Sequence, residues 1–222
     1  MNGFRVYLLD FDGTLAATRP AGVAGLTRTL AERGIAVPAS RMEAVIGTGV
    51  PLEVTLATLV PQLTDADIAI CATRYRVLYP EIDQEMTSLY DGVRGTLAGL
   101  ARNGRAVVVL SNKSRAALEA TLARFAILDQ ASAVLAADPG WPVKPDPQVF
   151  HRRVRPLFDG LAPSDFVMVG DTAADIAFAQ AAGIASCWVS YGYGDADNCL
   201  AMKPDFVVHN LPDLLTIGID PA

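Results

Sequence analysis

The sequence predicts an α/β fold, in which a doubly wound parallel sheet carries an inserted helical domain. Short apolar runs recur along the chain, and the segments between them have the 3.6-residue period of amphipathic helices. Strands that alternate with helices in this way are typical of a parallel sheet. One long interval, between Leu15 and about Leu89, contains helical patterns and no convincing strand. We therefore expect this interval to be a helical insertion into the α/β core.

Short apolar runs mark the strands of the predicted sheet. They are residues 6–9, 106–110, 133–137, 166–169, 185–189 and, less clearly, 206–208. Continuous apolar runs of this length are typical of strands buried on both faces. Between two of the runs, Val93, Leu97 and Leu100 share one face of a predicted helix, which can cover a face of the sheet.

The predicted insertion contains a series of short helical patterns. Their apolar positions cover residues 23–31, 42–46, 52–60 and 68–79. Pro80 is expected to end the last of these helices, because proline lacks the N–H that continues a helix. The apolar stripes can be buried against one another as a small bundle.

The predicted domain boundaries follow from this pattern. Residues 1–15 and 90–222 form the α/β core, and residues 16–89 form the helical domain. Hinges are expected near residues 16–20 and 86–92. A chain of 222 residues is long enough for one such core with a smaller domain inserted.

Composition and charge disfavour several classes of partner. Apolar residues make up 51% of the chain and charged residues 19%, which is typical of a folded protein with a sizeable core. The formal net charge is −6 and no basic stripe exists, so DNA, RNA and anionic membranes are not expected partners. No secretory signal and no membrane-length apolar run is found. We therefore expect a soluble cytoplasmic protein, monomeric or homodimeric, that binds a small molecule.

Groups of polar residues follow successive predicted strands, at the edge where a parallel sheet binds its ligands. In chain order they are Asp10-Phe11-Asp12-Gly13-Thr14, Ser111-Asn112-Lys113, Lys144-Pro145 beyond a loop, and Gly170-Asp171 with Asp175. Carboxylates, a hydroxyl and a lysine from distant parts of the chain are therefore expected to converge on one site.

The chemistry that such a site suggests is phosphoryl transfer. Several carboxylates near one point repel one another unless a hard cation neutralises them, and oxygen ligands without histidine favour Mg²⁺. One carboxylate can attack phosphorus to form an acyl phosphate, and a second can act first as acid and then as base. A hydroxyl, backbone N–H groups and a lysine can hold the phosphate oxygens.

Together these motifs resemble, in order and in position after their strands, the four motifs of the haloacid dehalogenase superfamily in its phosphatase form. The helical insertion is similar to the cap domain of the phosphoglycolate phosphatase and β-phosphoglucomutase group. The turn at residues 190–194 also looks like a Gly-rich turn of the phosphoglycolate phosphatases. The resemblance implies a Rossmann-like core with an inserted α-helical cap domain. It also implies a Mg²⁺-dependent hydrolase of a small phosphorylated metabolite, with phosphoglycolate as the best single candidate.

The resemblance assigns the chemistry to three acids. Asp10 would be the nucleophile and a ligand of the metal. Asp12 would be the general acid and base, and its backbone carbonyl would also reach the metal. Asp171 would be the third protein ligand. An acid at position 12 also argues against the dehalogenase branch of the family, which lacks one there.

The resemblance assigns phosphate binding to the second and third motifs. Ser111 and Asn112 would bind phosphate, and Lys144 would bind phosphate and orient Asp10 as a further catalytic residue. Asp175 would hold either the metal's waters or Lys144. The supporting positions are Gly13, Thr14, Gly170 and Asp175. Lys113 is expected to be a surface charge.

Other functions stay open at this point. A phosphomutase of the β-phosphoglucomutase type would pass the acyl phosphate to a sugar hydroxyl instead of water. A non-catalytic phosphate-binding or receiver-like protein would also have an aspartate pocket and a lysine, although without so large an insertion. A C–P hydrolase would need a lysine in the helical domain, and residues 16–86 contain none.

Overall fold

A parallel sheet of six strands forms the centre of the molecule, with strand order β5-β4-β1-β6-β7-β8. The computed structural model describes residues 3–218; residues 1–2 and 219–222, the ends of the predicted core, lie outside the described residues. The strands are β1 (Val6–Leu9), β4 (Ala106–Ser114), β5 (Ala133–Ala137), β6 (Phe166–Gly170), β7 (Ala185–Val189) and β8 (Phe206–Val208). The predicted α/β fold class is confirmed.

The order of the strands reverses beside β1. The chain passes from β1 outward to β4 and β5, and then returns through β6 to the other side of the sheet. Ligands of an open parallel sheet bind at the carboxyl ends of the strands next to such a reversal. The first motif, which directly follows β1, therefore lies where a ligand is expected.

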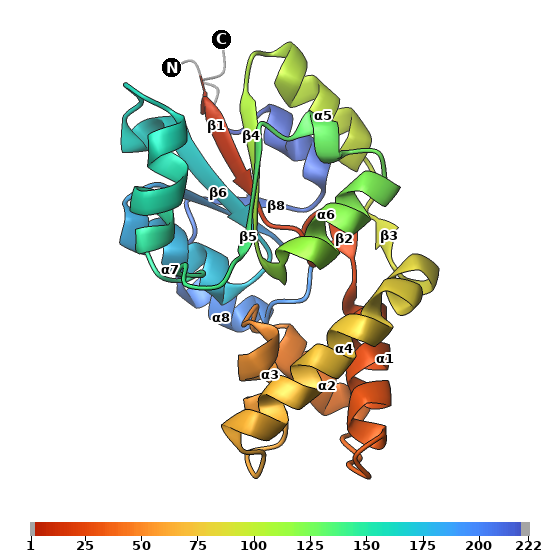
Figure 1. Ribbon diagram of the computed structural model, residues 1–222. Helices are drawn as coiled ribbons and strands as arrows, with labels where there is room; N and C mark the ends of the chain where they lie inside the picture. Colours follow the sequence, from red (N-terminus) through yellow and green to blue (C-terminus); the bar gives the residue numbers. More distant parts are fainter. Residues whose placement is uncertain (1–2, 219–222) are drawn as a thin grey trace.

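Helices cover both faces of the sheet (Figure 1). On one face pack α5 (Val93–Arg102), α6 (Arg115–Arg124) and the 3₁₀ helix η5 (Leu211–Leu215); on the other pack α7 (Ala173–Ala182) and the π-helical segment η2 (Phe150–Val154). Tyr7 and Leu9 of β1 belong to the first layer and Val6 and Leu8 to the second. Burial of each such aliphatic side chain contributes about 1.5–3 kcal/mol. Short elements complete the core, namely α8 (Ala196–Ala201), η1 (Leu128–Gln130), η3 (Arg155–Leu157) and η4 (Pro163–Asp165).

The second motif departs from its prediction in one respect. β4 does not end before Ser111 but continues to Ser114. Its pairing with β5 shifts register between Leu110 and Ser114, where Ser114 pairs with Ala137. Pairing with β5 is interrupted after Leu110 and resumes at Ser114. The polar residues Ser111, Asn112 and Lys113 can therefore lie within β4 instead of after it.

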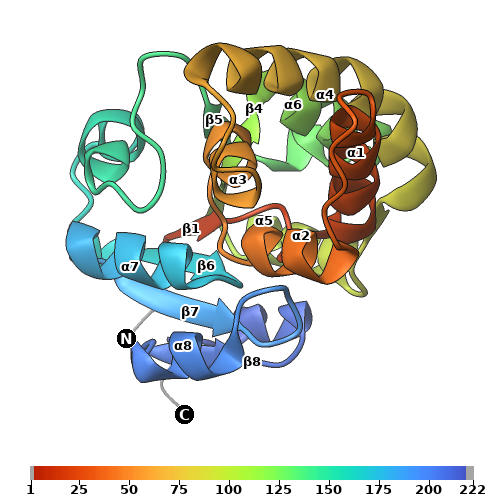
Figure 2. The same ribbon diagram turned by 90° about the horizontal axis from the view of Figure 1, so that it is seen from below.

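The interval without long strands forms a separate group of helices at the carboxyl edge of the sheet (Figure 2). They are α1 (Arg19–Ala31), α2 (Ala39–Ile46), α3 (Leu52–Leu59) and α4 (Asp65–Met86). Their buried side chains, among them Leu26, Leu30, Met42 and Leu56, form a cluster of their own. We call residues 19–86 the helical segment. Its status as an independent domain stays a prediction.

Two findings in this region correct the sequence analysis. First, α4 runs through Pro80 to Met86. Tyr79 and Ile82 are buried on either side of the proline, and their packing outweighs the cost of an interior proline, about 3 kcal/mol. Second, β2 (Ala16–Ala17) pairs antiparallel with β3 (Ser88–Leu89) at the predicted hinges. Strands this short carry no detectable periodicity.

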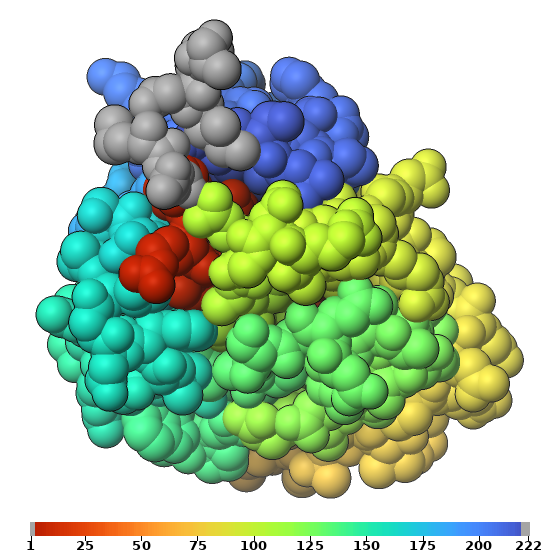
Figure 3. All heavy atoms as spheres, turned by 90° about the horizontal axis from the view of Figure 1, so that it is seen from above, coloured from red at the N-terminus to blue at the C-terminus, as the bar shows by residue number. Residues whose placement is uncertain are grey.

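Seen from the opposite, amino-terminal edge of the sheet, core residues fill most of the surface, and the helical segment shows only at the margin (Figure 3). Within residues 3–218, no helix combines the length and the hydrophobicity needed to cross a bilayer. The contact between core and helical segment is therefore at the carboxyl edge, where the polar motifs lie.

Candidate active site

Four buried charges from separate motifs meet at the carboxyl edge of the sheet. Lys144 Nζ lies 2.9 Å from Asp10 Oδ1 and 2.6 Å from Asp175 Oδ1. Carboxylate oxygens of Asp10, Asp171 and Asp175 lie within 4.8 Å of one another. Lys144 is only 4% exposed and the three acids are buried. The predicted convergence of distant motifs is therefore present in the structure.

Local backbone structure positions Asp10 and Asp171. Asp10 follows β1 directly, and its N–H donates to the carbonyl of Val169 in β6 (2.9 Å). Asp171 follows β6 and accepts the backbone N–H of Tyr193 (2.6 Å) and the hydroxyl of Thr14 (3.2 Å). The adjacent pairing of β1 and β6 thus brings the first and fourth motifs together.

Electrostatics in this cluster are dominated by burial. Burial raises the pKa of Asp10 well above its ordinary value; Lys144 opposes this effect, and the Asp175 and Asp171 carboxylates add to it. Burial, followed by the charge of Asp175, raises the pKa of Asp171 to about 7. Burial alone would lower the pKa of Lys144, but the charges of Asp10 and Asp175 raise it above its ordinary value. One lysine is therefore too little positive charge for three ionised carboxylates.

Asp175 has both carboxylate oxygens occupied by protein donors. Oδ2 accepts from the backbone N–H (3.1 Å) and hydroxyl (2.8 Å) of Thr172, in a capping box at the start of α7. Oδ1 accepts from Lys144. Of the two roles that the resemblance left open for Asp175, the structure shows the contact with Lys144.

Glycines allow the close approach of these acids. A Cβ on Gly170 would lie 2.2 Å from Asp175 Cγ, and one on Gly13, whose φ is +82°, would lie 2.2 Å from Asp171 Oδ2. Gly192 of the Gly-rich turn is equally tight against Asp171 Cβ (2.2 Å). These distances are far below a normal contact, so side chains at these positions would displace the acids.

Asp12 lies apart from the cluster of three acids and pairs with Lys113. Lys113 Nζ is 3.0 Å from Asp12 Oδ1 and 2.7 Å from the hydroxyl of Tyr79 in α4. The prediction that Lys113 is a surface charge is wrong, because its side chain is only 10% exposed. Burial is the largest single influence and opposes its charged form, but Asp12, with further contributions from Tyr75 and Asp83, raises the pKa of Lys113 above its ordinary value. Nothing in the local sequence signals this partner, since Tyr79 reads as part of an apolar stripe.

The second motif lies beside the cluster. Ser111 is buried and lines the cavity described below; its hydroxyl accepts the N–H of Lys113 (3.2 Å). The Asn112 amide donates to the carbonyls of Gly49 and Lys144 (both 2.9 Å) and accepts the N–H of Lys144 (3.0 Å). Asn112 therefore ties the loop of Lys144 to the helical segment.

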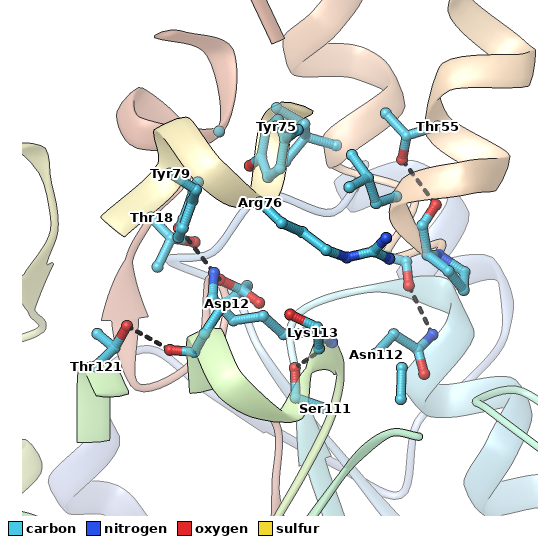
Figure 4. Close-up of a pocket in the computed structure, with 18 of the residues that line it drawn as sticks. Asp12, Thr18, Thr55, Tyr75, Arg76, Tyr79, Ser111, Asn112, Lys113 and Thr121 are labelled. Carbon is cyan, nitrogen blue, oxygen red and sulfur yellow. Dashed lines mark hydrogen bonds and ion pairs between the residues drawn. The ribbon is translucent and has the colours of Figure 1, made fainter. Parts of the chain in front are cut away.

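A cavity of about 850 Å³ opens over these side chains, between the core and the helical segment (Figure 4). Its floor includes Asp10, Ser111 and Lys144; its other walls come from α1, α3, α4 and α6 and include Leu26, Thr55, Tyr75, Arg76, Tyr79 and Arg124. No motif in the sequence marks Arg76 or Arg124, and Tyr75 and Tyr79 read only as part of an apolar helical stripe.

The cations of this cavity are paired with acids. Arg76 of α4 forms an ion pair with Glu53 of α3 (2.5 Å), and Arg124 of α6 pairs with buried Asp83 (3.0 Å). Both members of the Arg76 pair are about half exposed, with 44% and 46% of their side chains accessible. Arg76 is therefore able to exchange partners at little cost, whereas Asp83 is fixed in the protein interior.

Comparison with known proteins identifies the family of the chain. The family described as haloacid dehalogenase-like hydrolase matches residues 7–189, so the chain belongs to it. Two curated relatives are similar over nearly their whole length. The phosphoglycolate phosphatase (plasmid) of Cupriavidus necator is 34% identical, and the match covers 94% of this chain and 92% of the relative. The phosphoglycolate phosphatase of Pectobacterium atrosepticum is 30% identical, and the match covers 98% of this chain and 93% of the relative.

A solved structure agrees with this assignment. The crystal structure of a predicted phosphoglycolate phosphatase from Haemophilus somnus superposes with a TM-score of 0.85 at 25% identity, covering 96% of this chain and 97% of its own. Within the family the chain is thus phosphoglycolate phosphatase-like. The prediction of a hydrolase that acts on phosphate esters is confirmed at that level.

Replacement of Lys144 by Met is expected to destabilise the metal-free protein by about 3–5 kcal/mol, because it leaves buried carboxylates without their cation. Urea unfolding of Lys144→Met checks this loss, with the exposed Lys203→Met as the matched control. Adding Asp175→Asn to Lys144→Met is expected to recover part of the stability. Equal unfolding midpoints for Lys144→Met and Lys203→Met would contradict the prediction.

Proposed function

We propose that this protein is a Mg²⁺-dependent phosphomonoesterase that hydrolyses a small phosphorylated metabolite through an aspartyl-phosphate on Asp10. The observation that carries the proposal is the buried group of Asp10, Asp171, Asp175 and Lys144, of which Asp10, Asp175 and Lys144 line the cavity between the core and the helical segment. Such a group combines an attacking carboxylate with positive charge for the phosphate oxygens.

In this mechanism Asp10 attacks phosphorus and the bond to the leaving oxygen breaks. Lys144, held by Asp175, keeps Asp10 in one orientation and attracts the phosphate oxygens as charge moves onto them. Ser111, at the same floor, is placed to donate its hydroxyl to a phosphate oxygen. Asn112 serves this site through its hydrogen bonds to the backbone of Lys144, which set the position of the lysine.

Asp12 supplies the acid and base chemistry. It gives a proton to the departing alkoxide, and then takes a proton from the water that attacks the acyl phosphate. Its carboxylate is separate from the buried acids and 30% exposed, so water can reach it. Hydrolysis returns Asp10 to its carboxylate and releases inorganic phosphate.

The donor set fits a magnesium ion. Three buried carboxylates with one lysine leave an excess of negative charge, and the group contains neither histidine nor cysteine. Asp10 and Asp171 would hold the ion together with the backbone carbonyl of Asp12. Asp175, which accepts from Lys144 and from Thr172, would hold the lysine instead. The ion would neutralise carboxylates and phosphate so that they can approach one another.

The proposed substrate class rests on the cavity and on the relatives. The helical segment forms one side of the cavity, and we propose that it acts as a cap over a small substrate. Two relatives are phosphoglycolate phosphatases, which makes phosphoglycolate the first candidate. Its carboxylate needs a cation, and half-exposed Arg76, which extends from α4 across the cavity, is the proposed partner (Figure 4).

The test of the function is phosphate release from a panel of phosphorylated metabolites with Mg²⁺ present. Phosphoglycolate should be hydrolysed faster than ethyl phosphate, which lacks the carboxylate. Arg76→Met is expected to raise KM for phosphoglycolate by about tenfold or more, the effect of losing one charged hydrogen bond, and to leave ethyl phosphate unchanged. Turnover only with a sugar bisphosphate present would favour the phosphomutase, and no turnover of any ester would favour a phosphate-binding protein.

Removal of divalent metal is expected to abolish activity, and Mg²⁺ is expected to restore it. Because the ion binds only the folded site, Mg²⁺ should also raise the melting temperature of the chelated protein. Thermal unfolding with and without Mg²⁺, in wild type and in Asp171→Asn, checks this without an activity assay. Full activity after thorough chelation would contradict the metal assignment.

The cytoplasmic location and the oligomeric state stay predictions from the sequence.

A further inference from the structure

A continuous line of contacts joins Asp12 to the helical segment through Lys113 (Figure 4). Lys113 Nζ donates to Asp12 Oδ1 in the core and to the hydroxyl of Tyr79 in α4. Asp12 and Tyr79 come from the two sides of the cavity, so Lys113 is the bridge between them.

Lys113 is held at this position from several sides. Its amine lies 4.3 Å from the ring centre of Tyr79 and 6.0 Å from that of Phe11, within the range of cation–π contacts. A lysine with so little exposure is stable only where partners replace its lost hydration. Because Asp12 provides the opposite charge, each of the two side chains fixes the other.

Tyr79 depends in turn on how α4 rests on the core. Its ring stacks on Tyr75 of the same helix (5.1 Å between centres). One turn further along α4, buried Asp83 accepts from Thr121 (2.9 Å) and Arg124 (3.0 Å) of α6. The hydroxyl of Tyr79 is therefore in place only when α4 is docked against α6.

We propose that Lys113 is a positioning residue that aligns the Asp12 carboxylate for proton transfer, and that Tyr79 makes this alignment depend on docking of the helical segment. The inference rests on the proposed acid and base role of Asp12. It assigns Lys113 no direct contact with the transferred phosphate.

The consequence is a defect in proton transfer without a defect in binding. Lys113→Met is expected to lower kcat for phosphoglycolate by about 10- to 100-fold, the range for misplacement of a catalytic group, and to leave KM within about twofold. In an Asp12→Asn background the same change should cause no further loss, because the group that it positions is gone. A lysine that bound substrate itself would raise KM and act additively with Asp12→Asn.

Tyr79→Phe provides a second variant that removes a single oxygen. It is expected to lower kcat by about three- to tenfold, less than the full effect of one charge-assisted hydrogen bond because Tyr79 acts on Asp12 only through Lys113, and to have no effect once Lys113 is Met. Lys203→Met and Tyr7→Phe are the matched controls, since Lys203 is an exposed lysine and Tyr7 packs in the core and does not line the cavity. If Lys113→Met does not fold, Tyr79→Phe alone decides the question.

The set of variants separates this inference from the proposed function. Loss of activity in Asp12→Asn with wild-type activity in Lys113→Met and Tyr79→Phe would overturn only the positioning role. A raised KM in Lys113→Met, or a further loss when Lys113→Met is added to Asp12→Asn, would do the same. Wild-type activity in Asp12→Asn itself would overturn the acid and base role and the inference with it. Non-additive losses in kcat at an unchanged KM would support the inference.

Discussion

Asp10→Asn is expected to abolish turnover, with a loss of at least about 1,000-fold in kcat, because an amide cannot act as the attacking oxygen. The amide has nearly the shape of the carboxylate and carries no charge. Since Asp10 lies among Asp171, Asp175 and Lys144, removing one of three negative charges should leave the metal-free protein at least as stable as wild type. Loss of activity should therefore occur in a well-folded protein.

Two measurements check this result together. Phosphate release gives kcat, and urea unfolding of the metal-free protein gives stability. Asp129→Asn, an exposed acid in η1, is the matched control and should change neither. Turnover of Asp10→Asn within tenfold of wild type would contradict the role of Asp10 as nucleophile, whereas inactivity through unfolding would contradict only the electrostatic account of the site.

Asp12→Asn is expected to separate the two halves of the reaction. A good leaving group such as p-nitrophenolate needs no proton from Asp12, so the first step with p-nitrophenyl phosphate should stay fast. Hydrolysis of the acyl phosphate still needs a base and should slow by about 100- to 10,000-fold. Product should then appear as a burst of one p-nitrophenolate per active site, followed by slow turnover.

Rapid mixing with p-nitrophenyl phosphate measures the burst directly. Phosphoglycolate, whose leaving alkoxide needs protonation, should give slow turnover and no burst with the same variant. The absence of a burst together with wild-type turnover would show that another group transfers the proton. A burst that is as large with phosphoglycolate as with p-nitrophenyl phosphate would contradict the acid role of Asp12 and leave its base role intact.

The sequence by itself determined the strands of the core and the order of the four motifs. Apolar runs such as those of β1 and β6 are local signals, because burial on both faces demands apolar side chains at every position. The position of Asp10 and Asp171 after their strands is equally local. Once the strands are parallel, the carboxyl ends lie at one edge, and convergence of these acids follows.

Only the tertiary structure decided which groups touch which. The strand order sets β1 beside β6, the capping box at α7 holds Asp175 toward Lys144, and docking of α4 brings Tyr79 to Lys113. The continuation of α4 through Pro80 also comes from packing beyond the proline. Contacts between residues far apart in the chain leave no period or spacing in the sequence, because they depend on how whole elements pack.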